Sequence, residues 1–226
     1  MKFTMIAITA ASLAAVAGAD TLDFTDLNNG DFVSNQYAAQ GVNISALNPN
    51  RVFGLAQIFD TNLAGTLDPD LEDPFAVGNT DLNTDLGNIL ILAESNSGNP
   101  DDEGSRPAGT LIFDFDFTVQ SFGFHVVDLE DVTAENSSVE FFLGGVSVLE
   151  VDFNDFLAGG AYDNGAVFGN NSINLIDEIA VAGGFDKAEI NLGGSMGFDN
   201  ISYTIPAPGA LALLGLGAAT TIRRRR

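Results

Sequence analysis

Alternation of apolar and polar side chains is the feature that most constrains the fold of this chain. In residues 110–117 (TLIFDFDF), Leu111 and three phenylalanines have one parity, and two aspartates have the other. A period of two puts these sets on opposite faces of a β-strand, whereas a helix repeats every 3.6 residues. The same alternation returns in residues 121–127. The pattern therefore predicts strands with one buried face.

Other short apolar runs lie between clusters of Gly, Asn and Asp, which is the usual spacing of strands and turns. We predict strands at 22–25, 41–47, 51–59, 88–93, 110–117, 121–127, 138–143, 146–151, 178–182, 187–192 and 196–205. This number of short strands indicates an all-β fold, an antiparallel β-sandwich that is jelly-roll-like. The 18 Phe residues supply core bulk in a chain without Trp or Cys. Residues 60–87 and 94–108 are predicted to be long loops on one rim.

The first 19 residues have the pattern of a secretory signal peptide. Lys2 gives the positive start, an apolar run follows, and Ala17 and Ala19 fit the small-x-small cleavage rule. The run is too short to span a bilayer as a permanent helix. We therefore predict an N-terminal signal helix over 1–19 that is cleaved to leave Asp20 as the first mature residue.

The C-terminal segment 206–226 has three parts in a fixed order. It begins with Pro206, Ala207, Pro208 and Gly209, continues as a charge-free apolar stretch, and ends with Arg223, Arg224, Arg225 and Arg226. A helix over 209–222 is about 21 Å long, shorter than the hydrocarbon core of about 30 Å. The arginines stay on the cytoplasmic side by the positive-inside rule. The sequence predicts a short transmembrane helix that serves as a weak or temporary anchor.

This tail, through Pro206, Pro208, the apolar stretch and the terminal arginines, resembles the PEP-CTERM sorting signal. In that family a membrane protease, exosortase, cuts near the motif, and the cargo is released to the outer surface or an exopolysaccharide matrix. The resemblance implies transient inner-membrane insertion, with the secretion machinery and an exosortase-like protease as partners. The tail departs from the family pattern at Ala207, where the usual residue is Glu. The resemblance says nothing of the cargo domain 20–205. A plain tail anchor is the alternative.

Charge restricts the partners of the domain. Residues 20–205 contain all 31 acidic residues and only three bases, Arg51, Arg106 and Lys187, which gives a net charge of −28. Phosphate backbones would be repelled, so nucleic acid is excluded as a partner. The absence of Cys excludes disulfides, thiolate catalysis and Cys-based zinc sites. Such self-repulsion must be relieved by salt or cations, and calcium, abundant outside cells, is the candidate cofactor.

The first-choice metal site joins the two ends of the domain. Asp23 and Asp26 lie in or near the first predicted strand, and Asp199 and Asn200 lie in the last. In the last strand the apolar alternation changes parity at Asp199-Asn200, as a β-bulge would cause. A bulge can turn the carboxylate toward a neighbouring strand. The arrangement weakly resembles that of jelly-roll carbohydrate-binding modules, which implies a structural calcium between Asp23 and Asp199.

The second-choice metal site is the acidic rim segment with Asp60, Asp68, Asp70 and Asp73. Further acidic runs occur at 101–103 and 128–131. Carboxylates at this density suit a hard cation that takes six to eight oxygen ligands. An EF-hand beginning at Asp68 is excluded, because its sixth position is Asp rather than Gly. The alternative is a solvated acidic loop that binds nothing.

Catalytic motifs are weak in this sequence. The single histidine, His125, alternates with apolar residues on a predicted strand and has no partner signal, so we expect a packed or hydrogen-bonded strand residue rather than a catalytic base. There is no Gly-x-Ser-x-Gly nucleophile elbow.

We therefore expect an exported, non-enzymatic, calcium-stabilised protein of the cell surface or extracellular matrix. Its role is structural or adhesive, with polysaccharide as a candidate partner. The alternative is a secreted hydrolase that acts on polysaccharide with paired carboxylates. The absence of Trp and the presence of only three Tyr disfavour a sugar-stacking platform in either case.

Overall fold

The computed structural model describes residues 18–81 and 84–206. The strands of this part are β1 (Gly18–Leu22), β2 (Phe32–Val33), β3 (Val42–Leu47), β4 (Ala56–Asp60), β5 (Asn88–Leu92), β6 (Gly109–Val127), β7 (Ser138–Leu143), β8 (Val146–Asp152), β9 (Ile173–Leu192) and β10 (Gly197–Ile205). The helical segments are α1 (Val132–Glu135) and three short 3₁₀ turns, η1 (Ala38–Gln40), η2 (Pro69–Leu71) and η3 (Phe153–Phe156). The all-β prediction is confirmed for the described residues.

Two long strands replace four predicted ones. The predicted strands 110–117 and 121–127 are one strand, β6, because neither Gly nor Pro interrupts the chain between them. The predicted strands 178–182 and 187–192 likewise belong to β9. The ladder between β6 and β9 shifts register between Asp114 and Ser121, and bulges there let both strands bend without ending.

Two predicted boundaries are wrong at the start of the chain. The first strand was expected at 22–25, but β1 ends at Leu22, and Phe24 has a positive φ of 52°. The strand expected at 51–59 begins only at Ala56, because residues 51–52 form a bend.

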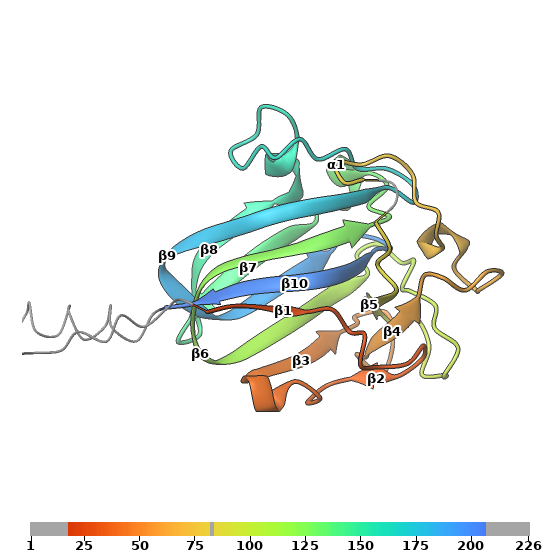
Figure 1. The fold of residues 1–226 in the computed structure, drawn as a ribbon, viewed down its shortest axis with the longest axis horizontal. Coiled ribbons are helices and arrows are strands. Elements are labelled where there is room, and N and C mark those ends of the chain that lie inside the picture. Colours follow the sequence, from red (N-terminus) through yellow and green to blue (C-terminus); the bar gives the residue numbers. More distant parts are fainter. Residues whose placement is uncertain (1–17, 82–83, 207–226) are drawn as a thin grey trace, which may run out of the picture.

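The bent β6–β9 pair connects two parts of the sheet (Figure 1). The first half of β6 pairs with β3 and with the second half of β9, which also carries β7 and then β8. The second half of β6 pairs with β10, which carries β5, β4 and β2 at one end and β1 at the other. Every pair of named strands is antiparallel. The result is a sandwich-like, antiparallel fold.

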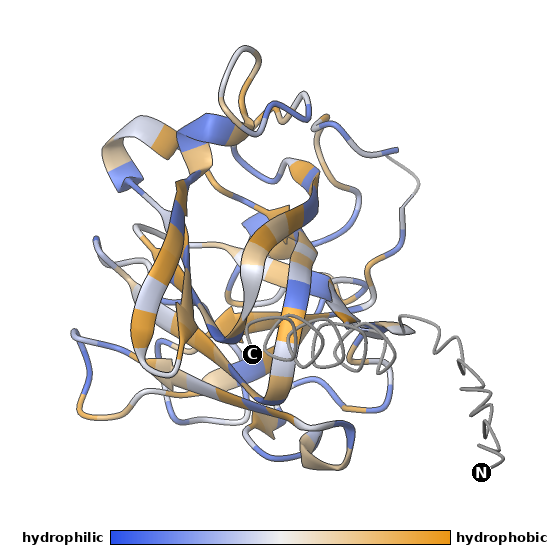
Figure 2. Ribbon diagram, turned by 90° about the vertical axis from the view of Figure 1, so that its left-hand side faces the viewer, coloured by the Kyte–Doolittle hydropathy of each residue, from blue (hydrophilic) through white to orange (hydrophobic). Residues whose placement is uncertain are grey.

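Phenylalanine fills the main core, as the alternation predicts. Leu111 and Phe113 are fully buried, while Asp114 and Asp116 are exposed on the other face of β6. Phe122 lies at the centre of the core, where its ring contacts five others, those of Phe113, Phe115, Phe124, Phe141 and Phe185. Apolar residues recur along the strands, while hydrophilic residues gather in the loops (Figure 2).

The long loop after β4 is packed, because it has a core of its own. Leu71, Phe75 and Leu86 from this loop are buried against residues of β4, β5, β6 and β9. They form a second apolar cluster that comprises Phe59, Leu71, Phe75, Leu86, Ile89, Ile91, Val127 and Ile173. Leu71 is fully buried, and Asp68, three residues before it in the chain, is buried as well.

The two ends of the described chain meet at one end of the fold. The register of β1 against β10 puts Gly18 opposite Ile205, and both ends leave on the same side (Figure 1). At the other end of these strands lie the loops that we call the distal rim, residues 48–54, 94–108, 128–137 and 193–196. The distal rim therefore faces away from the point where the terminal segments begin.

Candidate functional site

The bulge predicted at Asp199-Asn200 is present. The register between β10 and β6 shifts directly after Asp199, and Asn200 has a φ of 49°. The Asp199 side chain is buried, accepts a hydrogen bond of 2.8 Å from the Asn200 amide, and leaves its Oδ1 without a partner. The pKa of Asp199 is raised to about 8, chiefly by burial and to a smaller extent by the nearby negative charge of Asp23.

The other acidic residues of the first-choice metal site, Asp23 and Asp26, accept hydrogen bonds from different partners. The Asp23 carboxylate accepts hydrogen bonds from the backbone N–H and hydroxyl of Thr25, and Asp26 accepts one of 2.7 Å from the Tyr37 hydroxyl. The structure thus brings Asp23 into electrostatic range of Asp199. As the side chains stand in residues 18–81 and 84–206, no three acidic or histidine groups have the arrangement of a metal site. Calcium between Asp23 and Asp199 stays a prediction.

The residues of the second-choice metal site differ in burial and in hydrogen bonding. Asp60 accepts a hydrogen bond from the Asn62 backbone, and Asp73 is exposed. Asp70 is half-buried, and its Oδ1 lies 3.4 Å from the Asn170 amide nitrogen. Asp68 alone is buried, with 8% of its surface exposed. The four residues thus differ in burial and partners, and a metal site among them stays a prediction; Asp68 lies near other buried acids.

Asp68 belongs to a group that we call the buried acid cluster, which comprises Asp68, Asp102 and Asp128. These residues come from the loop before η2, from the 94–108 loop and from the end of β6, and none is more than 8% exposed. The Asp68 and Asp102 carboxyl groups lie close enough to interact electrostatically. The Ser195 hydroxyl lies 2.6 Å from Asp102 Oδ2 and 3.3 Å from Asp128 Oδ2, so it bridges these two residues.

Local structure holds the cluster in place. Asp128 follows the last residue of β6 with a positive φ of 68°, and its Oδ1 accepts a hydrogen bond of 2.6 Å from the Asn171 backbone. Asp102 forms an isolated antiparallel bridge with Ala93, just after β5. Asp68 immediately precedes η2, whose Leu71 is anchored in the second apolar cluster. Three separate backbone constraints therefore hold the three carboxyl groups together.

Burial dominates the electrostatics of this cluster. It raises the pKa of Asp102 well above its usual range, and the adjacent Asp68 raises it further. Burial also raises the pKa of Asp128 to about 7 and raises that of Asp68. The three bases of the described chain are paired elsewhere: Arg51 with Glu94 and Glu103, Arg106 with Glu130 and Glu135, and Lys187 with Glu189. Among the described residues, none of these ion pairs includes a carboxylate of the cluster.

The sequence shows the acidic runs, but it does not show that residues from different runs lie close together in the fold. Asp102 and Asp128 lie in the runs at 101–103 and 128–131, which sequence analysis noted without choosing them as site residues. Their proximity to Asp68 depends on the order of the strands, which a single sequence does not give. Ser195 carried no signal at all.

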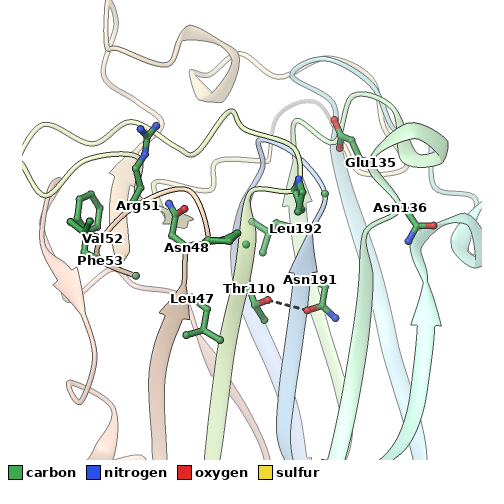
Figure 3. A pocket seen from close by; sticks show the side chains of 15 residues that line it. Leu47, Asn48, Arg51, Val52, Phe53, Thr110, Glu135, Asn136, Asn191 and Leu192 are labelled. Carbon is green, nitrogen blue, oxygen red and sulfur yellow. Dashed lines mark hydrogen bonds between the residues drawn. The ribbon is translucent and has the colours of Figure 1, made fainter.

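A cavity of about 710 Å³ opens at the distal rim (Figure 3). Arg51, Val52 and Phe53 lie on one side, and Glu135 and Asn136 lie on the other. The remaining lining residues include Leu47, Asn48, Thr110, Asn191, Leu192 and Gly193. Glu103, next to Asp102 in the chain, accepts hydrogen bonds from Arg51 and Asn48. The cavity and the buried acid cluster therefore share a supporting segment.

His125 lies opposite Asp199 in the register of β6 and β10. Its ring is half-buried, its Nδ1 has no hydrogen-bond partner, and burial lowers its pKa. The prediction that it is packed in a strand is confirmed; the hydrogen bond offered as an alternative is not seen at Nδ1.

A scan against protein-family models, a search of curated proteins and a search of solved structures found nothing that matches this chain. The fold therefore defines its class by itself: an all-β, antiparallel, sandwich-like protein. Among the described residues, no helix is long and apolar enough to cross a membrane. Of the predicted signal helix over 1–19, the part up to Ala17 lies outside these residues, and its last two residues, Gly18 and Ala19, are in strand β1 rather than in a helix. The tail from Ala207 onward also lies outside them.

Proposed function

We propose that this chain is an exported structural or adhesive protein of the cell surface or extracellular matrix. Its cargo domain is a jelly-roll-like sandwich that calcium stabilises, and a signal peptide and a PEP-CTERM-like tail direct it there. Polysaccharide is the proposed partner. The protein passes through the inner membrane with a transient anchor, and an exosortase-like protease removes the tail.

The pairing of β1 with β10 is the observation that carries this proposal. It places Gly18 beside Ile205, so the segments before and after the domain begin at the same end. A domain held by either segment would present its distal rim away from the membrane. This geometry suits a cargo domain that is attached to the membrane at one end, presents its distal rim to the outside, and is then released from the membrane.

The cavity at the distal rim supports a binding role over a hydrolytic one. A glycoside hydrolase needs two carboxyl groups about 5–9.5 Å apart across its substrate. Among the described residues that line the cavity, Glu135 is the only acid, and it is paired with Arg106. The lining instead combines the apolar side chains of Leu47, Val52 and Phe53 with amides, which suits the mixed apolar and polar faces of a sugar ring.

The test is to express the full chain in a Gram-negative host that has an exosortase-like protease, and to measure intact mass in each cell fraction. We expect surface or matrix protein that begins at Asp20 and lacks the four terminal arginines. A variant with Pro206 and Pro208 both changed to Ala should accumulate in the inner membrane. Recovery of the wild-type chain in the cytoplasm with residues 1–19 intact would refute export.

A further inference from the structure

We propose that the buried acid cluster binds one calcium ion, toward which the carboxylates of Asp68, Asp102 and Asp128 and the hydroxyl of Ser195 would turn from the positions that they have without it. Water molecules would complete the six to eight oxygen ligands that calcium takes. This inference deepens the proposed function, in which calcium stabilises the domain, by assigning a place to the ion. This place differs from the position between Asp23 and Asp199 that the sequence predicts as the first choice.

An unused oxygen inside the cluster points to a missing ligand. Asp68 is 92% buried, and its Oδ2 has no hydrogen-bond partner although it is shielded from solvent. An unpaired carboxylate oxygen in such a place is costly, so native structures rarely keep one without a partner or an ion. The same carboxyl group interacts with Asp102, so the unpartnered oxygen belongs to a member of the cluster.

The charge of the cluster requires a compensating positive species. Asp68, Asp102 and Asp128 bring three carboxyl groups into one buried cluster, where ionised groups repel one another. Arg51, Arg106 and Lys187 are each committed to glutamates. A cation bound among the three carboxylates would relieve their mutual repulsion.

The ligand types select calcium. All four side chains offer oxygen, which is what hard cations prefer, and neither His nor Cys takes part. The ligands come from loops and strand ends rather than from one rigid element, so they can form the irregular shell that calcium accepts. Magnesium demands a near-octahedral shell and gives up its water reluctantly, which suits this buried site less well.

Calcium here would connect four segments that are distant in sequence. It would join the loop before η2, the 94–108 loop, the end of β6 and the segment before β10. Because Glu103 follows Asp102 and holds Arg51 and Asn48, the ion would also steady one wall of the rim cavity. The site would therefore order the surface that we propose for polysaccharide binding.

Calorimetric titration of the full chain with calcium chloride tests the inference. The protein is purified in mild detergent, stripped with chelator, and compared with Asp102→Asn and Asp128→Asn. Asn keeps the shape of the side chain and removes one negative ligand. We expect a binding event with a Kd of about 0.1–1 mM, typical of extracellular calcium modules, that weakens about tenfold or more in each variant. Asp114→Asn, on the exposed face of β6, is the matched control and should titrate like the wild type.

The outcomes separate this site from the alternatives. If Asp102→Asn and Asp128→Asn titrate like the wild type while Asp199→Asn loses binding, the inference is wrong and the end-to-end site is right. If the wild type binds no calcium, the calcium part of the proposed function fails as well, while export is decided independently by the mass measurement. Ser195→Ala, which removes only a neutral ligand, gives a smaller loss and tests the same site if an Asp variant unfolds.

Discussion

The buried carboxyl group of Asp199 makes a testable prediction about pH. Burial holds the pKa of Asp199 near 8, whereas an exposed aspartate in the unfolded chain titrates near 4. Between these values the folded protein keeps a proton that the unfolded chain has lost. The contribution of this group to stability is therefore complete below about pH 4 and is lost as pH rises toward 8.

The magnitude follows from the size of the shift. Each unit of pKa difference is worth about 1.4 kcal/mol, so the free energy of unfolding should fall by up to about 4 kcal/mol between pH 5 and pH 8. Water penetration around the ionised group makes this a maximum. The Asp199→Asn variant has no proton to lose, so this part of the pH dependence should disappear.

Urea unfolding of the chelator-treated full chain at pH 5, 6, 7 and 8 measures the effect. The quantity to compare is the difference in slope between wild type and Asp199→Asn, because other acids also titrate in this range. The exposed Asp114→Asn variant should keep the wild-type slope. Equal slopes for wild type and Asp199→Asn would refute the assignment of the buried proton to this residue.

Three further predictions use the same unfolding assays. Millimolar calcium should raise the melting temperature of the chelated protein more than sodium chloride of equal ionic strength, because site binding adds to screening; equal effects would contradict a specific site. Phe122→Ala, at the centre of five ring contacts, should lower the free energy of unfolding by about 3–5 kcal/mol, and half-buried Phe53→Ala should lower it much less. At the bend of β9, Gly184→Ala should destabilise more than Gly183→Ala: both have positive φ, but only at Gly184 would a Cβ lie 2.4 Å from the Thr118 methyl group; equal destabilisation would contradict this packing.

Local pattern was enough to predict most strands and the bulge. The alternation around Phe113 and Phe198 reports which face is buried, and the change of parity at Asp199 reports an extra residue in the ladder. These are properties of one strand and its two faces. The fusion of predicted strands into β6 and β9 was not predictable in the same way: β6 bends at bulges between its two predicted strands without Gly or Pro, and β9 continues through Gly183 and Gly184, which usually mark a strand end.

Long-range proximity is what the sequence could not provide. Asp68, Asp102 and Asp128 are spread over 61 positions, and their meeting requires the antiparallel order of β5, β10 and β6. The acidic runs contain many carboxylates that remain in solvent, such as Asp73. Burial distinguishes the three clustered residues from such solvated carboxylates, and for Asp68 it accompanies the burial of the neighbouring Leu71 in the second apolar cluster.

The proposed cleavage after Ala19 agrees with how β1 is held. Gly18 and Ala19 are exposed, so their loss removes little buried surface. Asp20, Thr21 and Leu22 keep their places opposite Tyr203, Ser202 and Ile201. Leu22 is 1% exposed within the main core, and the Tyr203 hydroxyl lies 3.3 Å from the Asp20 carboxylate. A mature chain that begins at Asp20 therefore retains the part of β1 that anchors it to β10, while a cut beyond Leu22 would expose the edge of β10 that faces β1.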